Sequence, residues 1–523
     1  MARTSESDPI RFSEVLCGPG VLGLTFCPGK SGPSVFGDDW ERDLDIDLDA
    51  ARDWAASMVL TLVEPHELAM LNVAGLGAAV EARGMTWLHA PIKDVSIPDA
   101  AFERRWTLIG HLLRGELEKG NRVVVHCRGG RGRAGLIAAR LLVEFGAEPN
   151  EAIKTVRQAR PGTIETREQE DYVRRCQPIA HDHQIADRVL GCLFGGAVGD
   201  GFGYAIEFDR LADIHRRYGL EGLVEPILRD GKLVVSDDTQ MTLFTANALA
   251  GVKGDEDPTP AIRSAYLDWH RTQMGSGSGA GEEGLLRYAE LWRRRAPGMT
   301  CMSALAAGGH GTTDRPINDS KGCGGVMRVA PIGLRLDWDH ARTFEIAARA
   351  AAITHGHPSG FLSAGVMAAV VRQLVGGTGL VSAFERACES LPSDDESAET
   401  RNAIRHALHL ARTSPDAKRD VALKQLGEGW VGEEALAIAL NSVLVSSDFQ
   451  ETMRVSANHD GDSDSTASIA GQLFGAWFGL AGVPWSWIRE LDVFDALCDV
   501  SASLIATSVR RPARQCAWGD AYA

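Results

Sequence analysis

The strongest constraint on this chain is the run Val123-Val124-Val125-His126-Cys127-Arg128-Gly129-Gly130-Arg131-Gly132-Arg133. Its apolar start predicts a buried strand that delivers Cys127 into a glycine-rich turn, and a helix is predicted behind the turn at residues 136–145. Backbone amides of such a turn and of a helix N-terminus face a bound anion. Arg133 can hold two phosphate oxygens, and the same positive field stabilises the nucleophilic thiolate of Cys127. The run therefore predicts a phosphate cradle with a nucleophile at its base, and a structural cysteine in a strand-to-helix turn is the plainer alternative.

This segment resembles the His-Cys-x5-Arg signature of protein tyrosine and dual-specificity phosphatases. Residues 23–30 and 160–166 look like the kinase-associated-phosphatase branch of that family, so the likeness extends over roughly the first third of the chain. The resemblance implies that Cys127 is the nucleophile and that Arg133 clamps the phosphate. It also implies that the loop around them contacts the substrate, through His126, Gly129, Gly130 and Gly132.

The phosphatase family also needs a general acid for the leaving group, on a loop before the nucleophile. Pro91-Ile92-Lys93-Asp94 matches that loop, so Asp94 is the candidate acid and Asp99 is the second choice. One departure concerns the residue after the arginine, where the family has Ser or Thr to help the thiolate leave. Here it is Ala134, so a slow phosphatase and a phosphate-binding module both remain open.

Composition limits the classes of protein that the chain can belong to. Its 523 residues are too many for one ordinary core, and the net charge of -16 argues against a nucleic-acid or anionic-membrane surface. The ten cysteines include no Cys-x-x-Cys pair, which argues against zinc ribbons and disulfides and suits a cytoplasmic protein. The polar N-terminus is no signal peptide. The apolar residues 469–488 contain glycines and a proline, which favours a buried core helix over a membrane span.

The pattern of apolar residues changes along the chain and predicts two domains. Strand patterns at residues 58–63 and 122–126 alternate with helix patterns at residues 101–118 and 151–160. We therefore expect an α/β phosphatase-like domain with a mostly parallel sheet at residues 1–178. A linker at 179–184 then leads to an all-α domain at residues 185–523. Its predicted helices cover residues 185–198, 241–250, 344–353, 361–374, 433–445 and 468–478.

Two acidic clusters precede predicted helices in the second domain. One is Ser236-Asp237-Asp238-Thr239, and the other is Asp460-Gly461-Asp462-Ser463-Asp464-Ser465-Thr466. A single cluster would be an ordinary helix cap, but each of these has more carboxylates than a cap needs. If the clusters converge, their charges repel unless a cation lies between them. Hard oxygen donors suit Mg²⁺, Mn²⁺ or Ca²⁺ and disfavour zinc.

These clusters, together with three other segments, resemble the ADP-ribosylglycohydrolases, the group of dinitrogenase-reductase-activating glycohydrolase and the ADP-ribosyl-acceptor hydrolases. The other matching segments are residues 199–207, 322–328 and 354–358, in the family's order. That family holds two divalent metal ions between its acidic turns, and Mg²⁺ is expected here ahead of Mn²⁺. The resemblance implies as ligands Ser236, Asp237, Asp238, Asp462, Asp464 and Ser465.

The same resemblance assigns further roles. Glu207 would face the substrate ribose, and His355 would lie near the substrate or brace the following helix. Cys323 stands where relatives often have asparagine and is expected to fill the loop. The implied reaction is metal-assisted cleavage at C1″ of ADP-ribose, with an aspartate or a metal-activated water as base. Asp237, Asp238 and Asp462 would be catalytic, and the diphosphate would lie on the amides of Gly322, Gly324 and Gly325.

The leading interpretation is an ADP-ribosylglycohydrolase fused to a Cys-dependent phosphatase. Its expected partners are an ADP-ribosylated protein or an ADP-ribose-containing small molecule, and a phosphorylated substrate, with no nucleic acid or membrane. A reader module that targets the hydrolase and a phosphatase for phosphorylated ADP-ribose metabolites are the alternatives. Arg128 and Arg131 suggest a highly anionic phosphatase substrate, although both could face solvent. The acceptor linkage and the oligomeric state stay open.

Overall fold

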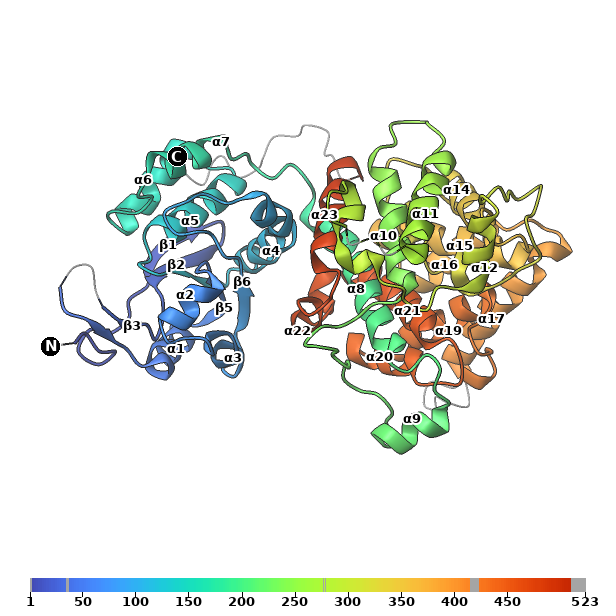
Figure 1. Ribbon diagram of the computed structural model, residues 1–523, viewed down its shortest axis with the longest axis horizontal. Helices are drawn as coiled ribbons and strands as arrows, with labels where there is room; N and C mark the ends of the chain where they lie inside the picture. Colours follow the sequence, from blue (N-terminus) through green and yellow to red (C-terminus); the bar gives the residue numbers. More distant parts are fainter. Residues whose placement is uncertain (1, 34–36, 276, 278, 414–422, 509–523) are drawn as a thin grey trace. The chain divides into compact units, whose positions relative to one another are not determined.

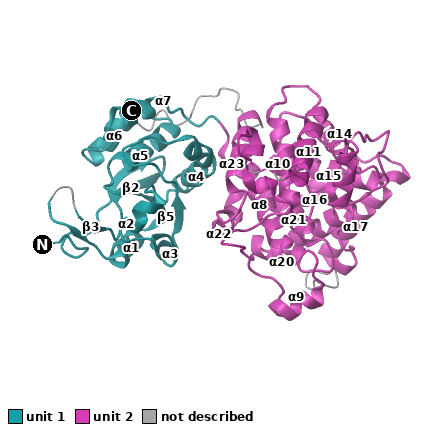
Figure 2. Cartoon of the chain, in the orientation of Figure 1, with its two compact units in different colours: residues 1–180, 511–523 teal, residues 181–510 magenta. Residues whose placement is uncertain are grey.

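The computed structural model describes residues 2–33, 37–275, 277, 279–413 and 423–508. The chain divides into two compact units between Ala180 and His181 (Figure 1; Figure 2). The first unit mixes strands and helices, and the second is helical. This confirms the predicted combination of an α/β domain and an all-α domain.

The first unit is built on a five-stranded sheet in the order β1-β2-β7-β5-β6. Only β1 and β2 pair antiparallel, and the other neighbours are parallel, so the predicted mostly parallel sheet is confirmed. The central strand β7 is buried along nearly its whole length because it has strands on both sides and helices packed against it, and it ends at Cys127. The strands are β1 (Ser13–Cys17), β2 (Gly20–Phe26), β5 (Ala56–Thr61), β6 (Thr86–His89) and β7 (Arg122–Cys127), beside a small pair, β3 (Ser31–Gly32) and β4 (Trp40–Glu41).

Helix α5 (Gly132–Glu144) follows β7 directly and is the central helix of this unit. All but one of its residues are buried, because it packs on the sheet and against neighbouring helices (Figure 1). Its N-terminus is therefore fixed at the carboxyl end of β7, which is the position that an anion cradle needs. The other helices are α1 (Leu44–Asp53), α2 (Pro65–Met70), α3 (Leu76–Glu81), α4 (Ala100–Glu118), α6 (Pro149–Ala159) and α7 (Arg167–Arg175).

The second unit has no strand beyond isolated bridges in its described residues. Its long helices are α8 (His183–Tyr204), α10 (Asp237–Ala250), α11 (Thr259–Met274), α14 (His340–Ala352), α15 (Pro358–Val375), α17 (Ala398–Thr413), α19 (Gly432–Val445), α21 (Ser463–Phe478) and α23 (Phe494–Ser508). The shorter ones are α9 (Leu211–Tyr218), α12 (Met299–Ala306), α13 (Ala330–Gly333), α16 (Leu380–Glu389), α20 (Phe449–Ala457) and α22 (Trp485–Ile488).

Helices α8 and α21 pack backbone to backbone along a row of small residues. A Cβ added to Gly475 would lie 1.9 Å from the carbonyl oxygen of Gly191, and one added to Gly203 would lie 2.1 Å from that of Ser463. Only glycine permits such an approach. The contact places the first turn of α21 against the C-terminal half of α8. Residues 199–203, which superficially resemble a dinucleotide loop, are part of this helical contact.

The apolar residues 469–488 form more than one helix. Helix α21 ends at Phe478, and Gly479 follows with a φ of 86°. Among the described residues, the one helix that is long and apolar enough to cross a membrane is α15, by length and composition only, and 89% of its apolar window is buried inside the protein. A core helix of a globular domain has the same features.

Candidate active sites

In the first unit, the turn after β7 wraps around the thiol of Cys127. The backbone N–H of Gly130 donates to Sγ of Cys127 at 3.2 Å. Gly130 has a φ of 70°, and a Cβ there would lie 2.2 Å from the carbonyl oxygen of Thr25, so this position requires glycine. Gly132 begins α5 and also packs tightly, with Glu165 Oε2 2.3 Å from a Cβ placed there. Gly129 is exposed, with open space beside it.

Arg133 is buried and held by two carboxylates. Its Nη1 lies 2.5 Å from Oε2 of Glu67, and its Nη2 lies 2.9 Å from Oε1 of Glu67 and 2.9 Å from Oδ1 of Asp94. Burial opposes its charge, but the hydrogen-bonded Glu67 outweighs this effect and raises the pKa of Arg133. The guanidinium is therefore charged and fixed in orientation beside Cys127. Glu67 was missed by the sequence analysis, because no local pattern links it to Arg133.

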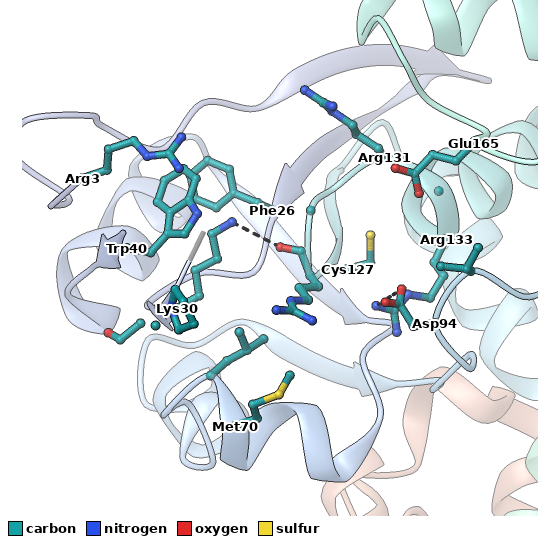
Figure 3. A pocket seen from close by; sticks show the side chains of 18 of the residues that line it. Arg3, Phe26, Lys30, Trp40, Met70, Asp94, Cys127, Arg131, Arg133 and Glu165 are labelled. Atoms are coloured by element: carbon teal, nitrogen blue, oxygen red, sulfur yellow. Dashed lines mark hydrogen bonds and ion pairs between the residues drawn. The ribbon is translucent and has the colours of Figure 1, made fainter. Parts of the chain in front are cut away.

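Of the two candidate acids, the structure places only Asp94 at the pocket. Asp94 lines the same cavity as Cys127, and its side chain is half-exposed (Figure 3). Asp99 is the N-cap of α4, where its carboxylate accepts from the N–H of Phe102 at 2.8 Å. Asp99 therefore stabilises a helix end.

His126 is the residue of β7 directly before Cys127. It is fully buried, its Nε2 lies 2.7 Å from Oγ1 of Thr61, and burial lowers the pKa of His126 to about 3. The ring is thus neutral and braces β7 against β5. Ala134, the residue after Arg133, is also fully buried, and as an alanine it has no hydroxyl.

The cavity around Cys127 has a volume of about 520 Å³ and is strongly cationic. In the view of Figure 3, Lys30, Trp40 and Arg3 gather on one side of Cys127, and Arg133 lies with Asp94 on the other. Arg128 and Arg131 were predicted from the sequence to serve an anionic substrate, whereas no local pattern pointed to Lys30. Further basic side chains of the lining are Arg128, Arg131 and Arg160.

In the second unit, Asp200 of α8 connects to the first acidic turn. Its Oδ1 accepts from the N–H of Ser236 at 2.8 Å, and its Oδ2 accepts from the N–H of Thr239 at 2.9 Å. Ser236 is the N-cap of α10, with Oγ accepting from the N–H of Asp238 at 3.2 Å. Burial raises the pKa of Asp200 to about 6. Asp200 lies within one of the segments that resemble the family, residues 199–207, but no role was predicted for it.

The second acidic turn begins α21 and forms hydrogen bonds with the loop that contains Cys323. Asp462 is the N-cap, and its Oδ2 accepts from Sγ of Cys323 at 2.7 Å. Oδ1 of Asp464 accepts from the N–H of Ser465 at 2.9 Å, and Oγ of Ser465 lies 3.5 Å from Sγ of Cys323. Cys323 therefore contacts two of the predicted metal ligands and does more than fill its loop.

The two acidic turns lie within range of each other's charges. Burial, and then repulsion from neighbouring carboxylates, raises the pKa of Asp237, Asp238 and Asp464 well above the usual range. Burial also raises the pKa of Asp462. Among the described residues, none of these four carboxylates has a lysine or arginine partner. Oδ2 of Asp238 is buried and has no hydrogen-bond partner in the described structure.

Glu207 lies at the edge of this acidic cluster. Burial, and then the charges of Asp464 and Asp237, raises the pKa of Glu207 to about 9, and its Oε2 is buried without a described hydrogen-bond donor. A cluster of buried acids without a compensating side chain fits a site for cations. In the described residues, no three His, Cys, Asp or Glu side chains are already arranged around one point as metal ligands. Oδ2 of Asp462 instead accepts a hydrogen bond from Sγ of Cys323.

The glycine loop of residues 322–325 packs over His355. A Cβ at Gly322 or Gly324 would lie 3.3 Å from Nε2 of His355, and burial lowers the pKa of His355 to about 3. Nδ1 of the neutral ring forms a hydrogen bond with Oγ1 of Thr354 at 2.8 Å. Gly325 is buried, and His357 caps α15. His355 therefore packs against the glycine loop and supports its conformation.

Comparison with known families decides the class of the second unit. A family model described as ADP-ribosylglycohydrolase matches residues 181–513, which is more than half of the chain. The chain belongs to the ADP-ribosylglycohydrolase family. A second model, described as "Swiss Army Knife protein, DSP-PTPase phosphatase domain", matches residues 59–173. Both are enzyme families, and both predicted resemblances are confirmed.

Individual relatives match each half separately. ADP-ribosyl-[dinitrogen reductase] glycohydrolase of Rhodospirillum rubrum is 25% identical over 314 residues, which is 59% of this chain and 92% of that protein. Cyclin-dependent kinase inhibitor 3 of Rattus norvegicus is 28% identical over 196 residues, which is 36% of this chain and 84% of that protein. A solved "ADP-ribosylglycohydrolase-related protein complex" is 24% identical and covers 62% of this chain and 99% of its own, with a TM-score of 0.44.

Proposed function

We propose that the second unit is a metal-dependent hydrolase that removes ADP-ribose from a modified acceptor or cleaves an ADP-ribose derivative. The observation that carries this proposal is the buried cluster of carboxylates at the starts of α10 and α21, which lacks a cationic partner among the described residues. Family membership and the glycohydrolase of Rhodospirillum rubrum support the same chemistry. The ligands would be Ser236, Asp237, Asp238, Asp462, Asp464 and Ser465.

Hard oxygen donors favour Mg²⁺, and Mn²⁺ is the alternative. Two bound cations would supply positive charge that orients the ribose hydroxyls and polarises a water. An aspartate of the cluster, with Asp462 as the first candidate, would take a proton from that water. The water oxygen would bond to C1″ as the bond from C1″ to the acceptor breaks, and the proton would pass to the released acceptor. Glu207 would face the ribose. The amides of Gly322, Gly324 and Gly325 would receive the diphosphate, with His355 holding their loop in place.

The test is hydrolysis of a panel of ADP-ribosylated substrates by the full chain, with and without chelator. Arginine-linked and serine-linked peptides and small ADP-ribose derivatives would report the acceptor. We expect release of ADP-ribose from one class, loss of release with chelator, and loss in Asp462→Asn but not in the exposed control Asp314→Asn. Release that survives both the chelator and Asp462→Asn would contradict the metal-dependent mechanism.

We propose that the first unit is a Cys-dependent phosphatase. The thiolate of Cys127 would attack phosphorus, and the bond to the leaving oxygen would break. Asp94 would act in its protonated form, released from Arg133 by the bound phosphate, and give its proton to that oxygen. Water would then cleave the phosphocysteine and release phosphate. The amide of Gly130 and the fixed guanidinium of Arg133 would stabilise the charge on the phosphoryl oxygens.

A second candidate role for this unit is phosphate recognition without turnover, because Ala134 lacks the hydroxyl that helps the thiolate leave. Rapid mixing with phenyl phosphate separates the two roles. A phosphatase gives a burst of phenol followed by slow turnover, whereas a reader gives no phosphocysteine. Ala134→Ser should speed the slow phase if the second chemical step limits turnover.

A further inference from the structure

Lys30 is a buried lysine that lines the catalytic cavity without an acidic partner. Only 7% of it is exposed, and it forms no ion pair with a carboxylate in the described residues. Its Nζ donates to the carbonyl oxygen of Arg128 at 3.4 Å. The ammonium lies 3.8 Å from the ring centre of Trp40 and 4.6 Å from that of Phe26. Aromatic faces hold a cation in place but do not neutralise it.

This arrangement contrasts with the other buried cations of the same unit. Arg42 is paired with Asp47, Arg114 with Glu144, and Arg133 with Glu67. Burying an unpaired charge is costly, so natural proteins usually supply a partner. Lys30 therefore lacks the counter-charge that the fold gives to its other buried cations.

A second unpaired cation lies beside Lys30. The side chain of Arg128 belongs to the turn around Cys127, lines the same cavity and has no ion pair among the described residues. A phosphoryl group above Cys127 would already be bound by the turn amides and Arg133. Lys30 and Arg128 are thus in excess of what a single phosphate needs, and Figure 3 shows Lys30 on the opposite side of Cys127 from Asp94.

We propose that Lys30 and Arg128 form a second anion-binding subsite next to Cys127, so that the preferred substrate is a small phosphate ester carrying a second phosphate group. The cavity of about 520 Å³ has the size of a site for a small molecule. Trp40 and Phe26 hold the ammonium at the cavity wall. This inference rests on the proposed phosphatase function, and it adds the class of substrate.

Rigid probes that differ by one phosphate test the subsite. The full chain carrying Cys127→Ser would be titrated calorimetrically with phenyl phosphate and with the 1,3- and 1,4-phenylene bisphosphates. We expect at least one bisphosphate to bind about tenfold more tightly than phenyl phosphate, as one added charge-assisted contact predicts. Adding Lys30→Met should reduce this ratio to about twofold or less. Lys119→Met, at the exposed end of α4, is the matched control and should leave the ratio unchanged.

Several outcomes would overturn the inference. One is an equal ratio of bisphosphate affinity to phenyl phosphate affinity in the parent and in Lys30→Met. Another is the absence of a preference for either bisphosphate, and a third is tighter binding of a singly phosphorylated peptide than of any bisphosphate. If Lys30→Met does not fold by thermal melting, Arg128→Gln replaces it with the same expected loss of ratio. Failure of the unmutated chain to hydrolyse phenyl phosphate would instead refute the phosphatase itself. Hydrolysis of phenyl phosphate without a bisphosphate preference would refute the subsite alone.

Discussion

The thiol of Cys323 lies 2.7 Å from Oδ2 of Asp462, the first residue of the second acidic turn. Burial, and then the charge of Asp462, raises the pKa of Cys323 well above its usual value, so the thiol keeps its proton and donates it. A carboxylate oxygen that would hold a cation is therefore occupied by a neighbouring donor. A cation that binds Asp462 through this oxygen would compete with the thiol for it.

Removing the thiol should strengthen cation binding. In Cys323→Ala, Oδ2 of Asp462 loses its donor, and we expect Mg²⁺ and Mn²⁺ to bind about three- to tenfold more tightly because one charge-assisted hydrogen bond no longer has to be broken. Calorimetry of the chelator-treated protein measures this change. Cys388→Ala, a half-buried cysteine of the same unit, is the control. Weaker binding in Cys323→Ala would mean that the sulfur itself contacts the cation.

Asp238→Asn should stabilise the metal-free protein while destroying its response to metal. Burial and neighbouring acids raise the pKa of Asp238, so ionising it at neutral pH costs folding free energy, and the amide avoids this cost. We expect the free energy of unfolding in chelator to rise by about 1–2 kcal/mol. In excess Mg²⁺ the order should reverse, because only the unmutated chain gains from ligand binding.

Urea unfolding under both conditions checks the reversal, with Asp314→Asn as the exposed control. A loss of stability in chelator would show that Asp238 makes a stabilising contact instead. A variant that Mg²⁺ still stabilises as strongly as the unmutated chain would remove Asp238 from the ligand set.

The two acidic turns were predictable because their signal is local. Serine and aspartate at a helix start are recognisable from a few adjacent residues, and the excess of carboxylates in each turn pointed to a shared ligand. Asp200 had no such signal, since it lies inside α8. It reaches the first acidic turn from there, while the glycine contact between α8 and α21 brings the second turn to the same helix. That contact depends on tertiary packing.

The phosphate cradle divides in the same way. Cys127, the glycines and Arg133 follow one another along the chain between a strand pattern and a helix pattern, so the turn was predictable from local sequence. Glu67 is 66 positions away from Arg133, and Lys30 is 98 positions away from Arg128. These pairs come together because the strands that precede Lys30 and Glu67 lie parallel to β7 on either side of it. No local sequence pattern encodes that strand order. The different positions of Asp94 and Asp99 likewise depend on where α4 begins, because Asp99 is the N-cap of that helix.

Asp94 and Asp99 should respond differently to substitution. Asp94→Asn removes the proposed proton donor at the cavity, and we expect kcat for an aryl phosphate to fall by about a hundredfold. Asp99→Ala removes the cap of α4 and should lower the free energy of unfolding by about 1 kcal/mol without a change in kcat. Steady-state kinetics and urea unfolding of both variants check this. A loss of kcat in Asp99→Ala that exceeds the loss in Asp94→Asn would exchange their roles.

The second anion subsite should lose affinity as pH rises through about 8. Burial, and then the charges of Arg3 and Arg42, lowers the pKa of Lys30 to about 8, while the thiols of Cys27 and Cys127 act in the opposite direction. The ammonium is therefore charged below this pH and neutral above it. Phosphate monoesters lose their second proton near pH 6, so the probe itself is fully charged throughout this range. Arginines stay protonated, and burial raises the pKa of Cys27, so neither titrates here.

Binding of a phenylene bisphosphate to the Cys127→Ser chain should accordingly weaken between about pH 7 and pH 9, whereas phenyl phosphate should change less. Below pH 8 the ammonium of Lys30 is already charged, so binding of the second phosphate needs no proton uptake. Above it, binding must first return a proton to Lys30, so calorimetry in two buffers of different ionisation enthalpy should detect proton uptake. In Lys30→Met both the pH dependence and the uptake should vanish. A bisphosphate affinity that stays flat through pH 8 in the parent would mean that the ammonium does not contact the second phosphate.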